Sequence, residues 1–452
     1  MNLRVISVSE LQKLQRAIPS SFLLSLPGGE FLQCDSVLRL LPGKRLVMRA
    51  TYAGETVLVK LFFEPCSAKK EWQGYAQLKK TGIKTPALLQ EKTLQTGSVL
   101  MYEFVQNAQP LSTLFAQASG AEKASLLQQL LVVLAVFYRE GIYQQDLHLG
   151  NFLWDAGQVV ALDPASCQVI NSSADMLDNL ALLLVQLPFA DWGWASAQII
   201  AQFDFVSPRL FERRARERGF ARQQAYMAKV MRDCTDVADV SVGNLRILCR
   251  RDYLTPAFER LLKMPLLLQE NVRLLKAGNS ATVGVMTVDD RPLVVKYYRD
   301  KDALRKVRRL FRRSRAARSW CFSHGLMHVG IDVAAPVALV EQRCGSFVSA
   351  AWFVSAYVEG DDLLSCWEKR EPTPHELAAI ASLFQGLANS RILHGDMKAS
   401  NLISTGEKVF LIDFDGAKIA SNQAMLARDK HRFLRNWDNP PLIQSLSGIL
   451  AL

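Results

Sequence analysis

One short polar pattern occurs twice in this chain, and the repetition constrains the fold more than any other feature. The first copy is QQDLHLGN (144–151) and the second is HGDMKASN (394–401). Each copy is followed by a short apolar segment that ends in aspartate, VVALD and VFLID. Three polar residues in and after the second copy lie 250 positions after those in and after the first: Asp396, Asn401 and Asp413 after Asp146, Asn151 and Asp163. Such a register indicates an internal repeat.

The segments before each loop also correspond. Residues 121–141 and 373–390 both predict a helix. The second has a capping box from Thr373 to Glu376 with Pro374 at the first helical position. The apolar segments after each loop predict short strands over 159–163 and 409–413. We therefore expect a helix, a polar loop and a strand in the same order in both halves.

Each half also has one lysine within an apolar strand. Lys60 lies in VLVKLFF and Lys296 in LVVKYY. A lysine among apolar residues is costly unless it has an anionic partner or lies on an exposed strand edge. Because the lysine recurs upstream of the same loop in both halves, we favour the functional interpretation.

The length and the repeat together predict two domains of the α+β class. Each would have a small β-rich lobe and a helical lobe, and the second helical lobe would be short because only 51 residues follow Asn401. We place the domains at 1–262 and 263–452, with the boundary near LLKMPLLL. The sequence there has no Gly/Ser-rich linker, so we expect the halves to pack closely.

The repeated residue types suit phosphoryl transfer. This reaction needs a cation for the phosphates of ATP, oxygen ligands for Mg²⁺ and a carboxylate that orients the attacking hydroxyl. We assign these roles as phosphate contacts to Lys60, Lys296 and Lys398, metal ligands to Asn151, Asp163, Asn401 and Asp413, and catalytic bases to Asp146 and Asp396. Taken singly, these aspartates and asparagines are also typical of turns and helix caps.

A phosphate-binding loop is less evident in the sequence. The hairpin that contains Gly278, Ser280 and Thr282 offers backbone N–H groups and two hydroxyls, without a Gly-x-Gly pattern. A plain β-turn is the alternative for this stretch. The equivalent stretch of the first half, around Gly43, is a poorer candidate.

The net charge of +11 is concentrated in one segment. Residues Arg299–Arg318 contain ten basic residues against Asp300 and Asp302. Such a run is either a solvated helix face or a surface for an anionic partner such as a membrane. We do not expect nucleic acid, because only Phe311 and Trp320 are available nearby to stack on bases.

Composition indicates the compartment. The eight cysteines have no CxxC spacing, and the N-terminus lacks the pattern of a signal peptide. The apolar run 126–138 is interrupted by polar residues and is too short to span a bilayer. We expect a cytoplasmic protein with reduced thiols, peripheral on the inner membrane.

These motifs resemble the protein-kinase-like fold, and within it the bacterial lipopolysaccharide core kinases that act on heptose or Kdo. The stretches GNSATVGVMTVDDRPLVVKYY and SRILHGDMKASNLIS are similar to the phosphate loop, lysine strand and catalytic loop of that family. The resemblance implies that Glu71 pairs with Lys60, and that Asp178 and Asp429 brace the catalytic loops. It also implies ATP and Mg²⁺ as cofactors, and the lipopolysaccharide core or a lipid A precursor as partner.

Three departures from the family pattern stand out. Gln144 and Gln145 replace His-Arg before Asp146, and Pro-Ala follows Asp163 where Phe-Gly is expected. In the second half, Ser319 occupies the position of Glu71, so Lys296 lacks its expected partner unless another acid substitutes.

The sequence leaves three functions open. The first is an ATP-dependent sugar kinase acting on the lipopolysaccharide inner core. The second is a pseudokinase scaffold in lipopolysaccharide assembly, and the third is a kinase for a small molecule or a protein. Retention of both metal-ligand positions in both halves favours the first.

Overall fold

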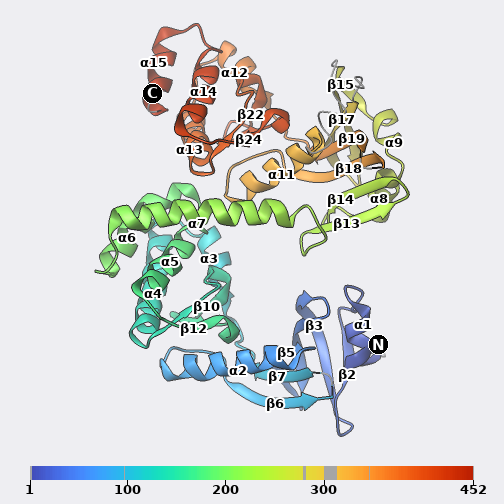
Figure 1. Cartoon of the computed structure of the whole chain (residues 1–452), viewed down its shortest axis with the longest axis vertical. Helices are drawn as coiled ribbons and strands as arrows, with labels where there is room; N and C mark the ends of the chain where they lie inside the picture. The colour runs from blue at the N-terminus through green and yellow to red at the C-terminus, as the bar shows by residue number, and fades with distance from the viewer. Residues whose placement is uncertain (1–2, 96, 278–280, 300–312, 346, 451–452) are drawn as a thin grey trace. The chain divides into compact units, whose positions relative to one another are not determined.

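The computed structural model describes residues 3–95, 97–277, 281–299, 313–345 and 347–450 (Figure 1). The chain forms two compact units. Unit 1 comprises residues 1–186 and 192–215, and unit 2 comprises residues 187–191 and 216–452. Helices and strands both contribute substantially, so the predicted α+β class is confirmed.

Unit 1 contains a seven-stranded sheet with the order β1-β2-β3-β4-β5-β7-β6. Its strands pair antiparallel except for β1 and β2, which are parallel. Residues such as Leu24, Met48 and Val59 are fully buried in its core. The strands are β1 (Val5–Ser7), β2 (Phe22–Ser25), β3 (Phe31–Leu41), β4 (Arg45–Tyr52), β5 (Glu55–Phe62), β6 (Leu88–Leu94) and β7 (Gly97–Glu103), with α1 (Val8–Leu14) after β1 and α2 (Pro65–Lys80) after β5.

The rest of unit 1 is mainly helical and carries two small sheets, β11-β10-β8 and β12-β9. The helices are α3 (Leu111–Gln117), α4 (Gly120–Arg139), α5 (Ser173–Leu184), α6 (Trp192–Gln202) and the first part of α7 (Pro208–Lys229). The short strands are β8 (Gln109–Pro110), β9 (Ile142–Gln144), β10 (Phe152–Asp155), β11 (Gln158–Ala161) and β12 (Cys167–Val169), and two 3-10 turns are η1 (Leu149–Asn151) and η2 (Pro164–Ser166).

Unit 2 contains a second seven-stranded sheet with the order β13-β14-β18-β19-β17-β16-β15. All its described neighbours pair antiparallel. Trp352 and Val354 are buried in its core. The strands are β13 (Val237–Val242), β14 (Leu245–Arg250), β15 (Arg273–Ala277), β16 (Thr282–Val288), β17 (Arg291–Arg299), β18 (Pro336–Cys344) and β19 (Phe347–Ala356), with α8 (Pro256–Lys263), α9 (Leu267–Glu270) and α11 (Arg315–His328) between them.

The remainder of unit 2 repeats the plan of unit 1, with small sheets β20-β22-β23 and β21-β24. Its helices are α12 (Leu363–Lys369), α13 (Pro374–Asn389), α14 (Gln423–Leu434) and α15 (Pro440–Ile449), besides η3 (Phe189–Asp191). Its strands are β20 (Asp361–Asp362), β21 (Ile392–Leu393), β22 (Leu402–Ser404), β23 (Val409–Leu411) and β24 (Lys418–Ile419), and its 3-10 turns are η4 (Ala399–Asn401) and η5 (Phe414–Gly416).

The two units share one order of elements. In each, a lysine strand, a helix and a β-hairpin precede two helices, the polar loop, a second hairpin and a 3-10 turn. Five sheet strands correspond in the same spatial order, β3-β4-β5-β7-β6 and β15-β16-β17-β19-β18. The extra strands differ, since β1 and β2 extend one edge whereas β13 and β14 extend the opposite edge.

The compact units divide earlier than the boundary expected between residues 262 and 263. Strand β14 pairs with β18, for example through Ile247 and Val340, and thereby carries β13 into the second sheet. The second part of α7 also packs in unit 2, where Arg391 lies over the Phe220 ring at 4.8 Å. These residues extend the helical part of unit 2, which the sequence predicted to be short.

Helix α4 passes a length-and-composition test for a membrane span, the only helix in the described ranges to do so. That test is also passed by core helices of soluble proteins. Six apolar side chains of α4, including Leu130, Leu134 and Phe137, are buried, and the helix packs on α6 and β9. The eight cysteines are all free thiols.

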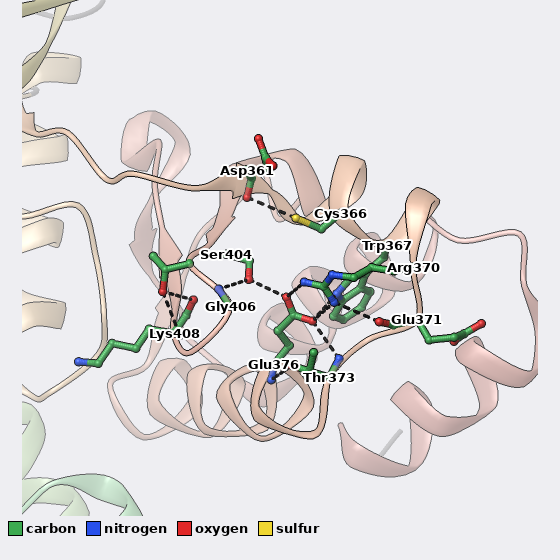
Figure 2. A network of polar contacts seen from close by, with 11 residues as sticks. Asp361, Cys366, Trp367, Arg370, Glu371, Thr373, Glu376, Ser404, Gly406 and Lys408 are labelled. Carbon is green, nitrogen blue, oxygen red and sulfur yellow. Dashed lines mark hydrogen bonds and ion pairs between the residues drawn. The ribbon is translucent and has the colours of Figure 1, made fainter.

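A buried carboxylate anchors the start of α13, the helix that precedes the polar loop of unit 2 (Figure 2). Glu376 is fully buried and accepts hydrogen bonds from both Nη atoms of Arg370 at 2.7 and 2.8 Å. Trp367 Nε1 donates to it at 3.1 Å, Thr373 N at 2.9 Å and Ser404 Oγ at 2.6 Å. The predicted capping box is confirmed, and it also ties α12 and β22 to α13.

Glu376 predicts an acid-sensitive element of stability. Burial alone would raise the pKa of Glu376, but the hydrogen bonds from Arg370, Ser404, Thr373 and Trp367 outweigh it and lower the pKa to about 2. A carboxylate with a depressed folded-state pKa contributes stability that is complete above its unfolded pKa and is lost as pH falls through the folded value. We expect Glu376→Gln to lower the free energy of unfolding by about 2 kcal/mol at pH 7 and by less at pH 3, measured by urea denaturation. Equal losses at both pH values would contradict this assignment.

Candidate active site

In unit 1, the strand lysine is paired with a helix carboxylate as the sequence predicts. Lys60 lies on β5 and Glu71 on α2, and their side chains form a hydrogen-bonded ion pair. Glu71 is fully buried and Lys60 is 8 % exposed. The Tyr102 hydroxyl donates to the same oxygen of Glu71 at 3.3 Å. The carboxylate therefore compensates a cation that an apolar strand could not otherwise accommodate.

The polar loop of unit 1 brings its asparagine and both aspartates into one turn region. Asn151 Nδ2 donates to the backbone O of Asp146 at 2.8 Å, so its Oδ1 is turned away from that contact. Leu162 N donates to Asn151 O at 2.8 Å, which sets Asp163 beside the loop. Asp163 has a left-handed backbone (φ 53°), and Arg45 Nη1 lies 3.7 Å from its Oδ1. The side chain of Asp146 is exposed.

Gln144 holds the polar loop of unit 1 through a side-chain hydrogen bond, and this contact explains one departure from the family pattern. Its Nε2 donates to Leu162 O at 2.6 Å. At the equivalent place in unit 2, His394 Nε2 donates to Ile412 O at 2.9 Å. An amide thus replaces an imidazole in holding the loop to the residue before the second aspartate.

The residue that braces the loop of unit 1 is Asn179 and not Asp178, so that prediction is wrong by one position. Asn179 Nδ2 donates to Gln144 O at 2.6 Å and its Oδ1 accepts from Tyr138 at 2.9 Å. Asp178 faces Arg214 instead, at 3.7 Å. One helical position rotates a side chain by about 100°, so neighbours on a helix face different surroundings.

In unit 2 the lysine has two carboxylate partners, both from the segment after the polar loop. Lys296 Nζ on β17 lies 2.6 Å from Asp413 Oδ1 and 3.1 Å from Asp415 Oδ1. Ser319 on α11 is buried and its hydroxyl lies 3.2 Å from Asp415 Oδ1. Another acid therefore substitutes for the carboxylate that is absent at Ser319, because Asp415 lies within ion-pair distance of Lys296.

The two carboxylates differ in their electrostatic environment. Burial would raise the pKa of Asp413, but the Lys296 ion pair and hydrogen bond lower it below its ordinary value. Burial raises the pKa of Asp415, and the charge of Asp413 adds to that effect although Lys296 opposes it. Lys296 thus forms ion pairs with both neighbouring carboxylates.

The polar loop of unit 2 has the same backbone contacts as that of unit 1. Asn401 Nδ2 donates to Asp396 O at 2.8 Å, and Ile412 N donates to Asn401 O at 3.0 Å. Asp413 has a left-handed backbone (φ 64°). Asp396 is half-buried; Lys398 Nζ lies 3.2 Å from its Oδ1, and Arg432 from α14 forms an ion pair with the same oxygen. The candidate base is therefore flanked by two cations.

Asp429 braces this loop as the sequence predicts. It is buried, and it accepts from His394 N, and from Gly395 N at 3.1 Å. Gly395 has φ +83°, and a Cβ there would lie 2.7 Å from Gly416 O. Only glycine suits such a left-handed backbone in close contact with a carbonyl.

The predicted phosphate loop lies mostly outside the described residues. Gly278 and Ser280 fall in the range that the structure does not describe, whereas Thr282 begins β16 opposite Tyr297. Residues 300–312 of the basic segment are likewise outside it. Two of its described arginines have internal contacts, since Arg315 lies over the Tyr298 ring at 5.2 Å and Arg318 Nη1 donates to Asp415 O at 2.6 Å.

The donor set fits Mg²⁺. In both units, the asparagine donates its Nδ2 to a backbone carbonyl, which leaves Oδ1 for a metal, and its backbone O accepts from the residue before the second aspartate. The pairs are Asn151 with Asp163, and Asn401 with Asp413. Mg²⁺ is commonly held by one or two protein oxygens together with substrate phosphates and water. No group of three or more His, Cys, Asp and Glu side chains arranged for a metal occurs among the described residues.

A lysine held by carboxylates, an aspartate on a loop and an Asn-Asp oxygen pair form a site of the kinase class. Residues 268–441 match the model of the lipopolysaccharide kinase (Kdo/WaaP) family. The predicted resemblance to that family is thereby confirmed for this segment, all of which lies in unit 2. No curated protein matches the chain.

Sequence reasoning missed several residues that shape the two sites. Asp415 carried a signal, because it stands directly after Asp413-Phe414 where the family pattern has glycine. Tyr298 and Tyr102 gave none, since an aromatic residue in a strand is ordinary. The ion pairs of Arg45 and Arg432 join residues more than 30 positions apart and depend on the tertiary fold.

Loss of the Asp429 brace should loosen the loop. We expect Asp429→Ala to lower the free energy of unfolding of unit 2 by about 2–3 kcal/mol, because it leaves two backbone N–H groups in a buried site without an acceptor. Asp429→Asn retains one acceptor oxygen and should lose less. Urea denaturation of both variants checks this, and an Asp429→Ala transition at the wild-type urea concentration would contradict it.

Proposed function

We propose that the chain is an ATP- and Mg²⁺-dependent phosphotransferase that transfers the γ-phosphate to a hydroxyl of a heptose or Kdo sugar in the lipopolysaccharide inner core. The observation that carries the proposal is the convergence of Lys296, Asn401, Asp413 and Asp396 within the segment that matches the lipopolysaccharide kinase family. The sugar acceptor is inferred from the family alone.

Each residue of unit 2 has a role in this proposal. Lys296 contacts the nucleotide phosphates, and Asn401 and Asp413 provide the oxygen ligands of the metal. The metal, when bound, neutralises charge that develops on the phosphates. Asp396 accepts the proton of the sugar hydroxyl, and Lys398 lies beside it to contact the transferred phosphate. Because Arg432 also pairs with Asp396, an anionic group of the acceptor would find a cation close to the base.

We assign catalysis to unit 2 and infer that unit 1 is a second kinase-like domain derived from the same repeat. The shared order of elements and strands supports the repeat. Unit 1 retains Lys60, Glu71, Asn151 and Asp163, and these residues would suffice to bind a nucleotide. A pseudokinase scaffold is the alternative for unit 1, and the cation of Arg45 near Asp163 favours it because it competes with a metal for that carboxylate.

The catalytic assignment predicts a large effect at Asp396. Purified full-length chain with Mg²⁺ and radiolabelled ATP should label dephosphorylated core oligosaccharide, and EDTA should abolish the labelling. We expect Asp396→Asn to lower kcat about 10³-fold, within the range for loss of a general base. Asp438→Asn, at an exposed position between α14 and α15, is the matched control and should behave as wild type.

The same assay distinguishes the two loops. Loss of transfer in Asp146→Asn with full activity in Asp396→Asn would move catalysis to unit 1. Transfer that survives in the Asp146→Ala, Asp396→Ala double variant would overturn the assignment of both bases.

Binding can be separated from chemistry by thermal shift. A native-state ligand at a hundred times its Kd stabilises by about 2.7 kcal/mol, so Mg²⁺-ATP should raise Tm by several degrees. We expect Lys296→Met to remove the part of the shift that comes from unit 2, and any remaining shift would report nucleotide binding by unit 1. A wild-type chain whose Tm is unchanged by Mg²⁺-ATP would favour the scaffold for the whole protein.

The acceptor implies a site of action. If the substrate is lipid-linked, the chain acts as a peripheral protein at the cytoplasmic face of the inner membrane, with Arg299–Arg318 toward anionic headgroups. Co-sedimentation with vesicles of anionic and of neutral lipid tests this part of the proposal, and equal binding to both would contradict it.

A further inference from the structure

The lysines of the two units are held by carboxylates from different parts of the fold. In unit 1 the carboxylate is Glu71, which comes from the helix after the lysine strand. In unit 2 the corresponding helix α11 has Ser319 instead, and the 3-10 turn after Asp413 has Asp415 where unit 1 has Ala165. Unit 1 thus has the acid on the helix and alanine at the turn, whereas unit 2 has serine on the helix and the acid at the turn.

Asp415 is fixed by several contacts, as an anchoring group must be. Its Oδ1 accepts from the Tyr298 hydroxyl at 2.5 Å and from the Ser319 hydroxyl at 3.2 Å, and it lies 3.1 Å from Lys296 Nζ. Its backbone O accepts from Arg318 Nη1 at 2.6 Å. These partners come from two elements, β17 and α11, and together they fix the position of Asp415.

Unit 1 has the same chemistry around Glu71. There, too, one carboxylate oxygen receives both a lysine and a tyrosine hydroxyl, the latter from Tyr102. In both units the lysine Nζ also lies 5.4 Å from the ring centre of that tyrosine. The two sites therefore share a lysine, carboxylate and tyrosine cluster, although the carboxylate and the tyrosine come from different elements.

A second carboxylate is needed because Asp413 has another task. Asp413 is the nearer partner of Lys296 here, but the proposed function requires its oxygens for the metal. Once Asp413 turned to a cation, a lysine with no other partner would lose its orientation. Asp415 remains within ion-pair distance to hold it.

We propose that Asp415 is the positioning residue for Lys296, replacing across the fold the helix carboxylate that Glu71 supplies in unit 1. This inference rests on the proposed function only in that Lys296 contacts nucleotide phosphates. The Tyr298 and Ser319 hydroxyls align the carboxylate, and Lys296 is thereby directed at the nucleotide while Asp413 holds the metal.

The test measures nucleotide affinity by calorimetry on the full chain, with adenylyl imidodiphosphate as the probe and Lys296→Met to define the contribution of unit 2. We expect Asp415→Asn, which keeps the shape of the side chain but removes its charge, to weaken this contribution about tenfold. The weakening should appear both with Mg²⁺ and in EDTA, because a lysine anchor acts on phosphate directly. Asp438→Asn is the matched control.

Moving the carboxylate back to the helix provides the decisive variant. We expect the Asp415→Gly, Ser319→Glu double variant to recover affinity to within about threefold of wild type, whereas Asp415→Gly alone stays weak. Wild-type affinity in Asp415→Asn would overturn the proposal, and so would weakening confined to Mg²⁺, which would make Asp415 a metal ligand. A folded double variant, judged by Tm, that stays as weak as Asp415→Gly would overturn it as well.

The outcome is independent of the sugar acceptor. If the wild-type chain binds the nucleotide and the swap restores affinity but no core oligosaccharide is labelled, the proposed substrate fails and the role of Asp415 stands. If labelling is normal and Asp415→Asn binds as wild type, the role of Asp415 fails and the proposed function stands.

Discussion

The arrangement of both units depends on the need to neutralise a lysine inside an apolar strand. A cation among the side chains of β5 or β17 destabilises the sheet unless a carboxylate lies within a few ångströms. In unit 1 this need ties the sheet to α2 through Glu71. In unit 2 it ties the sheet to the turn after the polar loop through Asp413 and Asp415. The ion pairs of the two lysines therefore join different parts of the chain at each site.

The two units solve the same structural problem with different residues around a shared framework. Gln144 and His394 make the same contact to the backbone O of the residue before the second aspartate. Asn179 and Asp429 both brace the loop, one as a donor and the other as an acceptor. Such exchanges preserve backbone geometry while changing charge. Unit 1 thus keeps the same backbone contacts of the loop with fewer carboxylates around it, because Asn179 and Ala165 stand where unit 2 has Asp429 and Asp415.

The sequence predicted much of the fold because its signals are local or periodic. The capping box at Thr373 and the two lysine strands depend on residues close in the chain, and the structure has each of them. The division into compact units differs from the limit expected at 262 for the opposite reason. Strand β14, which carries β13 with it, pairs with β18 almost a hundred residues later, and no local pattern reveals this pairing. The partner of Lys296 was missed likewise, because the pairing with Asp415 joins residues that are distant in sequence.

The most direct test of this account is a crystal structure of the full chain with Mg²⁺ and a non-hydrolysable ATP analogue. We predict metal density between Asn401 Oδ1 and Asp413, with Lys296 Nζ on a nucleotide phosphate and still within 4 Å of Asp415. A structure in which the nucleotide is bound elsewhere, or in which Lys296 stays on Asp413 and no metal lies beside Asn401, would contradict the kinase assignment of unit 2.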